Sequence, residues 1–231
     1  MTDSIINRIR PVSEPYPYPV RDWPPQAFYH DALVTRLDLE RLNELINAGA
    51  SETEIDAYLR GHPSTLAFCR GKWSTGHHAS WIIPQQEIRP TLPNATHGLK
   101  PDYLLGGKNS GGITWHVLEL KSPSDKVFVR NSKGRLKFSE TAHEGMFQLL
   151  EYIDYCASAQ SYLRDTLGLT GFREPTGLLV IGRLEEFEDT DHQAMKAAWK
   201  RLASDRLQIT TYDSLLGGIK GFVEWQEEQR S

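Results

Sequence analysis

The chain has 231 residues, enough for one sizeable domain or for one domain with a modest extension. Its 30 acidic and 26 basic side chains give a formal net charge of −4, so any surface that binds nucleic acid must be a local one. Two cysteines without metal-type spacing fit reduced thiols rather than a disulfide framework. The N-terminus has no signal-peptide pattern, and no apolar run is long enough to span a membrane. We therefore expect a cytoplasmic protein that does not engage membranes.

The first thirty residues are rich in proline and aromatic side chains, which predicts an extended arm rather than a regular element. Such an arm either lies on its own domain or embraces a second subunit. We divide the chain into an N-terminal arm with a helix, residues 1–50, and a main domain, residues 51–231.

Two helices are predicted after the arm. The first, over residues 31–48, has an apolar stripe at near-helical spacing. Its members are Leu33, Leu37, Leu42, Leu45 and Ile46. The second, over residues 52–60, begins with a capping box in which Ser51 is the N-cap and Glu54 is the third helical residue.

A strand, a glycine-rich turn and a second strand form the centre of the predicted fold. The first strand starts at residues 101–105, the turn spans 106–112, and the apolar, β-branched run 113–120 follows. A strand over residues 80–88 precedes this pair. The predicted centre is therefore a β-hairpin.

Three ionisable residues mark the ends of this hairpin. Asp102 stands at the start of the first strand, and Glu119 and Lys121 stand two apart at the end of the second. Because side chains on a strand alternate between its faces, Glu119 and Lys121 point to the same side. If Asp102 shares that side, two carboxylates and an amine come together.

The remaining pattern alternates strands and helices. The long helix over residues 140–159 has a buried stripe of Met146, Leu149, Leu150, Ile153 and Cys156. The other predicted elements are a hairpin within 127–138, a short helix over 160–167, a strand over 176–183, a helix over 188–204, a strand over 207–211 and a last helix over 212–229. This order predicts an α/β (or α+β) fold with a mixed central sheet flanked by helices.

Basic side chains concentrate in residues 121–137. This segment has six basic residues and one acidic residue, Asp125. The basic residues are Lys121, Lys126, Arg130, Lys133, Arg135 and Lys137. The alternation of Lys133, Arg135 and Lys137 places them on one face of a strand. Such a run is either a solvated face or a surface for the phosphate backbone of nucleic acid.

Phosphodiester hydrolysis suits the acid–acid–lysine set. A hard divalent cation such as Mg²⁺ or Mn²⁺ binds one or two protein carboxylates together with substrate phosphate. Asp102 and Glu119 are the candidate carboxylates, and the carbonyl of Leu120 is a further candidate ligand. Lys121 either activates the attacking water or holds the scissile phosphate.

Pro101-Asp102, sixteen residues, and then Glu119-Leu120-Lys121 resemble the PD-(D/E)xK nuclease signature. Gln148 and Tyr152 match the QxxxY motif of the RecB-like branch of that superfamily. The stretch 51–63, with ITTYDSLL at 209–216, resembles more specifically the nuclease domain of Shedu anti-phage defence proteins. The resemblance covers residues 51–220.

The resemblance implies a restriction-endonuclease-like core and metal-dependent cleavage or nicking of DNA. Glu54 would supply a further acid to the metal, with Glu52 as its competitor, and Gln148 and Tyr152 would position the DNA backbone or metal-bound water. Family members tend to form oligomers, so a homo-oligomer is expected.

Other interpretations remain open from the sequence. The same scaffold could be a non-catalytic module that binds nucleic acid or a protein through the basic hairpin, or a repair or restriction nuclease. Glu119 and Lys121 could form a mere surface ion pair, and Gln148 and Tyr152 could be ordinary helix residues. The nuclease interpretation requires Asp102, Glu119, Lys121 and Gln148 on one side of the sheet.

Overall fold

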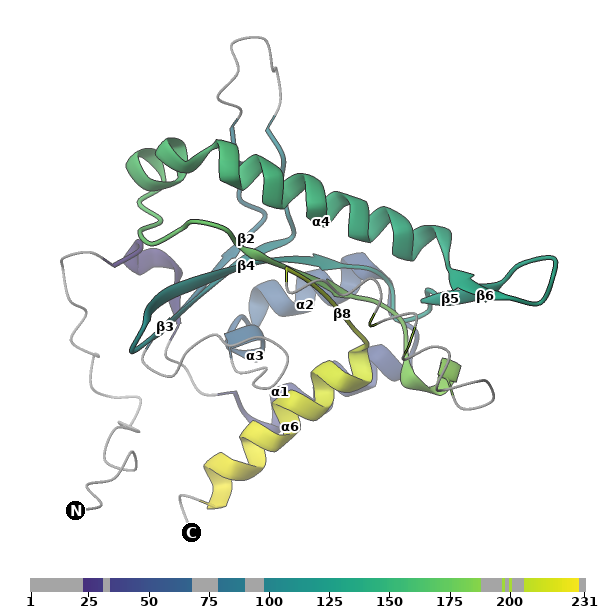
Figure 1. The fold of residues 1–231 in the computed structure, drawn as a ribbon. Coiled ribbons are helices and arrows are strands. Elements are labelled where there is room, and N and C mark those ends of the chain that lie inside the picture. The colour runs from purple at the N-terminus through teal and green to yellow at the C-terminus, as the bar shows by residue number, and fades with distance from the viewer. Residues whose placement is uncertain are drawn as a thin grey trace.

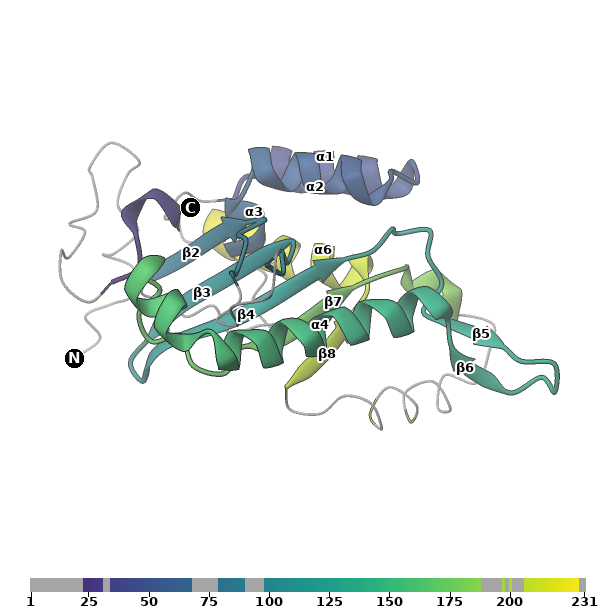
Figure 2. The same cartoon turned by 90° about the horizontal axis from the view of Figure 1, so that it is seen from above.

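The computed structural model describes residues 23–30, 34–67, 79–89, 98–187, 197, 200 and 206–228. A mixed six-stranded sheet lies at its centre, in the order β1-β2-β3-β4-β7-β8 (Figure 2). Its strands are β1 (Tyr29–His30), β2 (Ala79–Pro84), β3 (Tyr103–Asn109), β4 (Gly112–Leu120), β7 (Thr176–Val180) and β8 (Leu207–Thr210). The first four are antiparallel neighbours, whereas β7 and β8 join β4 in parallel. The predicted α/β class with a mixed sheet is confirmed.

Helices cover both faces of the sheet. Helix α4 (Glu140–Ser158) lies on one face, and α1 (Arg36–Asn47), α2 (Glu52–Gly61), α3 (Ser64–Ala67) and α6 (Tyr212–Glu228) lie on the other (Figure 1). Each face has its own apolar core because alternate strand residues point to opposite sides. Within the described residues, no helix combines the length and apolarity that crossing a membrane requires.

Local sequence signals fix where the helices begin. Thr35 caps α1 through a capping box with Asp38, and Ser51 caps α2 through the predicted box with Glu54. The hydroxyl of Ser139 accepts the N–H of Ala142 at the start of α4. These caps satisfy backbone N–H groups that have no partner inside the helix.

The described part of the N-terminal arm lies on its own domain. Tyr29–His30 forms the edge strand β1 beside β2. The rings of Trp23 and Tyr29 pack against Trp81, with centroids 5.3 and 6.0 Å away. Residues 1–22 lie outside the described residues. Helix α1 packs against α6 and buries Leu39, Leu42 and Ile46 in the same core as the main domain.

Several predicted details are wrong. Leu37 belongs to the predicted apolar stripe of the first helix and Leu150 to the predicted buried stripe of the long helix, but they are 73 % and 48 % exposed. The buried residues of α1 are instead Leu39, Leu42 and Ile46, and Leu150 is not among the buried residues of α4. The short helix predicted over 160–167 is confirmed, as a π-helical turn over Tyr162–Thr166. Most of the helix predicted over 188–204 lies outside the described residues.

A small second sheet projects from the body of the molecule. Strands β5 (Phe128–Arg130) and β6 (Leu136–Phe138) pair before α4 and extend past its N-terminal end (Figures 1 and 2). The rings of Phe128 and Phe138 pack at 4.5 Å and anchor the hairpin. Because β6 begins at Leu136, Lys133 and Arg135 belong to the turn, so the predicted three-residue strand face does not form.

Candidate functional site

The candidate site lies where β4 ends. Antiparallel pairing of Tyr103 with Leu118 sets the register of β3 and β4, and one further step places Asp102 opposite Glu119. On the other side, Lys121 donates its N–H to the carbonyl of Val180, which continues the parallel ladder with β7. The pairing of β3, β4 and β7 therefore brings Asp102, Glu119 and Lys121 to one end of the sheet.

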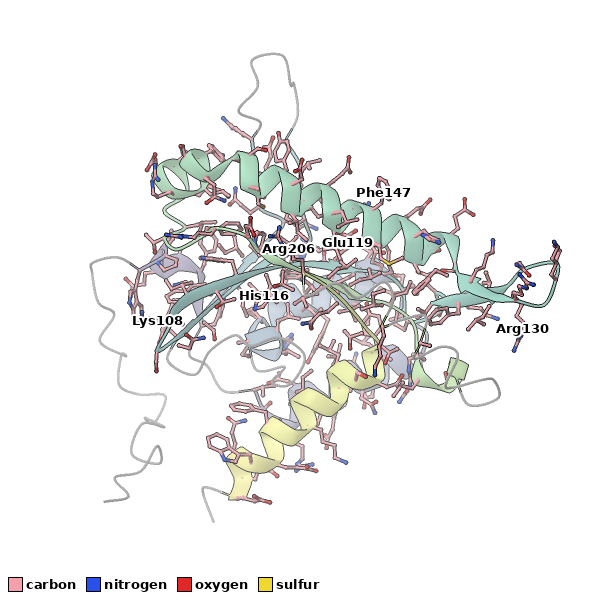
Figure 3. All side chains as sticks on the ribbon, in the orientation of Figure 1. Lys108, His116, Glu119, Arg130, Phe147 and Arg206 are labelled. Atoms are coloured by element: carbon pink, nitrogen blue, oxygen red, sulfur yellow. The ribbon has the colours of Figure 1, made fainter. Side chains whose placement is uncertain are left out.

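These three side chains belong to the face that α4 covers. Leu104 and Val117 are in the core beneath α4, and Asp102, Glu119 and Lys121 follow them at even spacing along the two strands. A Cβ atom at Gly145 of α4 would lie 3.4 Å from Cε of Lys121, which places the lysine directly under this helix. The view in Figure 3 likewise has Glu119 on the α4 side of the sheet. The structure thus places Asp102, Glu119 and Lys121 on the same side of the sheet.

Asp102 is held from several directions. Its Oδ2 accepts the N–H of Leu120 at 2.8 Å, and its carbonyl accepts the N–H of Gln85 at 2.7 Å. Gln85 adopts a φ of 46°, a left-handed conformation that is costly for a residue other than glycine. The strained turn after β2 therefore helps to place the carboxylate.

The ladder between β3 and β4 ends at Pro101. The register places Pro101 opposite Leu120, and proline has no N–H to donate to the Leu120 carbonyl. Leu120 instead donates its own N–H to Asp102. This arrangement fits the prediction that the Leu120 carbonyl is a candidate ligand beside the two carboxylates.

Glu119 and Lys121 form a nearly buried ion pair. Oε1 of Glu119 lies 2.8 Å from Nζ of Lys121, and the two side chains are only 6 % and 12 % exposed. Burial, with a further contribution from Asp102, raises the pKa of Glu119 to about 7. Burial lowers the pKa of Lys121, but the hydrogen bond to Glu119 and the surrounding acids outweigh it, so the net shift is upward. Lys121 is therefore an ammonium ion at neutral pH, and this pair is not a surface ion pair.

Two buried oxygen atoms near the site have no hydrogen-bond partner within the described residues. They are Oε2 of Glu119 and Oε1 of Gln148. A buried acceptor without a donor is costly, and such atoms in a native structure point to a missing ligand, ion or water. Gln148 comes from α4, as expected if this helix contributes to the site.

Tyr152, one turn after Gln148, supports the strand that carries Asp102. Its hydroxyl donates to the carbonyl of Lys100 at 3.4 Å. Burial raises the pKa of this hydroxyl, and the negative charges of Glu119 and Asp102 raise it further. Tyr152 therefore feels the charge of the two carboxylates and holds the chain just before Asp102.

Helix α2 brings Glu52 to the cluster and does not bring Glu54. The carboxylate of Glu54 is exposed and accepts the N–H and the hydroxyl of Ser51, at 2.8 and 2.7 Å. Burial raises the pKa of Glu52, while the charge of Lys121 lowers it and that of Asp102 raises it. The capping box occupies Glu54, so Glu52, the competitor that the sequence offered, is the acid of α2 whose charge interacts with Lys121 and Asp102.

The residues present fit a hard cation in kind. Asp102 and Glu119 supply carboxylate oxygens and the Leu120 carbonyl supplies a backbone oxygen, and no described residue donates to Oε2 of Glu119. All of these features suit Mg²⁺ or Mn²⁺. Among the residues that the structure describes, no group of three or more His, Cys, Asp or Glu side chains is close enough to hold a metal by itself. Mg²⁺ sites commonly use one or two carboxylates and complete their shell with water and substrate phosphate.

The basic residues predicted to contact nucleic acid are exposed around the β5–β6 hairpin. They are Lys126, Arg130, Lys133, Arg135 and Lys137. Asn131 shapes the turn by accepting the N–H groups of Lys133 and Arg135, both at 3.0 Å. Arg130, labelled in Figure 3, donates to the carbonyl of Gly134 at 2.8 Å. The hairpin thus presents its positive charge beyond the body of the molecule.

Two residues with a structural role at this site were not predicted. The backbone of Gln85 holds Asp102, and the hydroxyl of Tyr212 donates to the carbonyl of Lys121 at 2.7 Å. Tyr212 belongs to the ITTYDSLL stretch, which the sequence resemblance marked without assigning it a role. No sequence signal marks Gln85, because its role depends on a backbone conformation.

The fold and the cluster define an α/β protein with an acidic, lysine-containing site at the end of a central strand. The family model described as Shedu protein SduA, C-terminal, matches residues 49–216. This match spans more than half of the chain, so the protein belongs to the Shedu family of anti-phage defence proteins. A search of curated proteins found no match.

Proposed function

We propose that this protein is a metal-dependent DNA endonuclease that nicks or cleaves phosphodiester bonds in anti-phage defence, on a PD-(D/E)xK core. The observation that carries the proposal is the convergence of Asp102, Glu119 and Lys121 under α4, where Oε2 of Glu119 has no donor from the part of the chain that the structure describes. Family membership supports the defence role, and the chemistry of the cluster supports the reaction.

The proposed metal is Mg²⁺ or Mn²⁺, which when bound neutralises charge on the phosphoryl group and lowers the pKa of water. Asp102 and Glu119 would hold it, with the Leu120 carbonyl. Lys121, which the surrounding acids keep protonated, would bind a non-bridging oxygen of the scissile phosphate rather than act as the base. Gln148 would orient water or the DNA backbone through its amide, whose oxygen has no donor among the described residues.

The β5–β6 hairpin would position the DNA. Its exposed Lys and Arg side chains suit sequence-independent contacts to phosphate. The hairpin directly follows the site along the chain, since Lys121 is separated from β5 by a single turn. DNA bound there would lie next to the acidic cluster.

A plasmid assay tests this proposal. Supercoiled plasmid is incubated with purified protein and Mg²⁺ or Mn²⁺, and with Asp102→Asn, Lys121→Ala and Lys108→Ala. Lys108 lies on β3 near the opposite end of the hairpin from the site (Figure 3), so its variant is a matched control for loss of a lysine. We expect cleavage by the wild type and Lys108→Ala and its loss in the other two. Plasmid that is bound but left intact with both metals would refute the proposal.

The exposed basic hairpin also favours a second candidate, a non-catalytic module that binds nucleic acid. Such a module needs no metal, so calorimetry with Mn²⁺ would show no binding, and DNA affinity would be the same in Asp102→Asn. Metal binding that is lost in this variant would argue against the second candidate.

A further inference from the structure

We propose that Tyr212 is a positioning residue for Lys121. Its hydroxyl replaces the backbone hydrogen bond that the sheet would otherwise make to the Lys121 carbonyl. The claim about cleavage rests on the proposed function, whereas the claim about position does not. Tyr212 is fully buried at the start of α6, on the face of the sheet opposite to α4. It therefore acts on Lys121 through the backbone and does not reach the reacting atoms.

The parallel ladder between β4 and β7 explains why Lys121 needs this partner. Leu120 pairs with Val180, and Lys121 donates its N–H to the Val180 carbonyl at 2.9 Å. A continued parallel ladder would then supply the N–H of Gly182 to the Lys121 carbonyl. In this protein Gly182 adopts a left-handed φ of 68°, and its N–H donates instead to the carbonyl of Ser122, at 3.3 Å. The Lys121 carbonyl has lost its ladder donor.

The Tyr212 hydroxyl fills that place at 2.7 Å. The position of Tyr212 is itself fixed, since its N–H donates to the Gly182 carbonyl at 3.1 Å. The next residue, Asp213, holds the loop after β7 through Arg183, at 2.8 Å, and through the N–H of Leu184, at 2.6 Å. The start of α6 is thus tied to the chain that follows both β4 and β7.

Both backbone groups of Lys121 are consequently bonded to elements far away in the sequence. The N–H of Lys121 is bonded to β7 and its carbonyl to α6. The backbone of Lys121 is therefore held in place while its side chain donates to Glu119. Loss of the hydroxyl would leave the carbonyl without its donor and loosen this backbone, although the lysine itself remains. A phenylalanine keeps the ring and removes only the hydrogen bond.

Tyr212→Phe tests the inference, with Tyr58→Phe as the matched control. The Tyr58 hydroxyl also donates to a backbone carbonyl, that of Asp38 at 2.8 Å, but it joins α2 to α1 away from the site. The rate of amide hydrogen exchange, measured without metal, reports how firmly the backbone of Lys121 is held. Plasmid cleavage with Mg²⁺ gives kcat and KM. We expect exchange at Lys121 and Ser122 to become about tenfold faster in Tyr212→Phe alone. We expect kcat to fall roughly tenfold or more, with KM unchanged.

The two proposals fail in different ways. If the wild type does not cleave DNA, the proposed function fails and hydrogen exchange alone decides the role of Tyr212. Unchanged exchange at Lys121, or a kcat equal to that of the wild type, overturns the inference. Failure of Tyr212→Phe to fold while Tyr58→Phe folds also overturns it, because the hydroxyl would then serve the whole fold rather than Lys121.

Discussion

Burial under α4 controls the charge of the Glu119 carboxyl group. The group lies beside Asp102 in a site where only a few per cent of its surface is exposed, and its pKa is raised to about 7. Ionisation of Glu119 is therefore less favourable in the folded protein than in the unfolded chain, even with Lys121 2.8 Å away. A cation near Oε2 would reverse this balance, which is how a site of this kind couples stability to metal binding.

The stability of the metal-free protein should fall as the pH rises from about 4.5 to 7. The folded pKa of Glu119, about 7, exceeds its ordinary value of 4.5. The folded state thus binds the proton more tightly, and the stabilisation present below pH 4.5 is lost as the pH passes the folded pKa. Urea unfolding should show a loss on the order of 2–3 kcal/mol relative to Glu119→Gln. Identical pH profiles for the two proteins would contradict the shift.

At the scale of elements, α4 approaches the sheet closely at Gly145. A Cβ atom at Gly145 would come within 2.7 Å of Cδ1 of Leu179, a buried residue of β7, and within 3.4 Å of Lys121. Gly145 thus sets the distance between the helix that carries Gln148 and the strands that carry the acids.

Gly145→Ala should destabilise the protein by about 1–3 kcal/mol, because the added methyl group overpacks the interface between α4 and β7. Gly221→Ala, at an exposed position in α6 with no atom within 4 Å of the new Cβ, is the control. It should stabilise by about 0.5–1 kcal/mol through helix propensity alone. Chemical unfolding measures both, and a stabilised Gly145→Ala variant would show that α4 can move away at little cost.

The β5–β6 hairpin is the element on which DNA binding should depend. Replacing Lys133, Arg135 and Lys137 with Gln leaves its aromatic anchor, Phe128 and Phe138, in place. We expect the slope of log affinity against log salt to decrease by about 0.9 for each side chain that contacts phosphate. Fluorescence anisotropy with duplex DNA measures this slope. Lys220→Gln, on the opposite face of the molecule, should leave it unchanged, and an equal effect there would mean that binding is diffuse.

Charge is unevenly distributed over the whole molecule. The net charge is −4, yet the hairpin is basic, while the exposed acids of α4 are Glu140, Glu144, Glu151 and Asp154. DNA is therefore expected to approach from the hairpin and the end of β4 rather than across the outer face of α4. The exposed Phe147 on that outer face (Figure 3) adds an apolar surface that DNA would not use.

The assembly state is a prediction at the same scale. We expect a homo-oligomer on the basis of family resemblance, so light scattering at micromolar concentration should give a multiple of the 26.3 kDa chain mass. Removal of residues 1–22 tests whether the proline-rich arm contributes. A 26.3 kDa particle for the full chain would contradict the expectation.

Local patterns in the sequence determined most of the elements. The capping box at Ser51, the hairpin around the glycine-rich turn and the long helix with Gln148 and Tyr152 were predictable because each depends on neighbours within a few residues. Strand alternation likewise placed Glu119 and Lys121 on one face. The sequence also predicted the family, which the match to residues 49–216 confirms.

Only the tertiary structure decided which groups complete the site. Glu52 and Glu54 lie two apart on one helix. The capping box explains Glu54 from local sequence, whereas the charge interaction of Glu52 with Lys121 and Asp102 arises only in the folded protein. Gln85 and Tyr212 hold Asp102 and Lys121 through backbone carbonyls, and such contacts leave no side-chain pattern. Burial of the Glu119–Lys121 pair depends on α4 packing over the sheet, a long-range contact that local sequence does not encode.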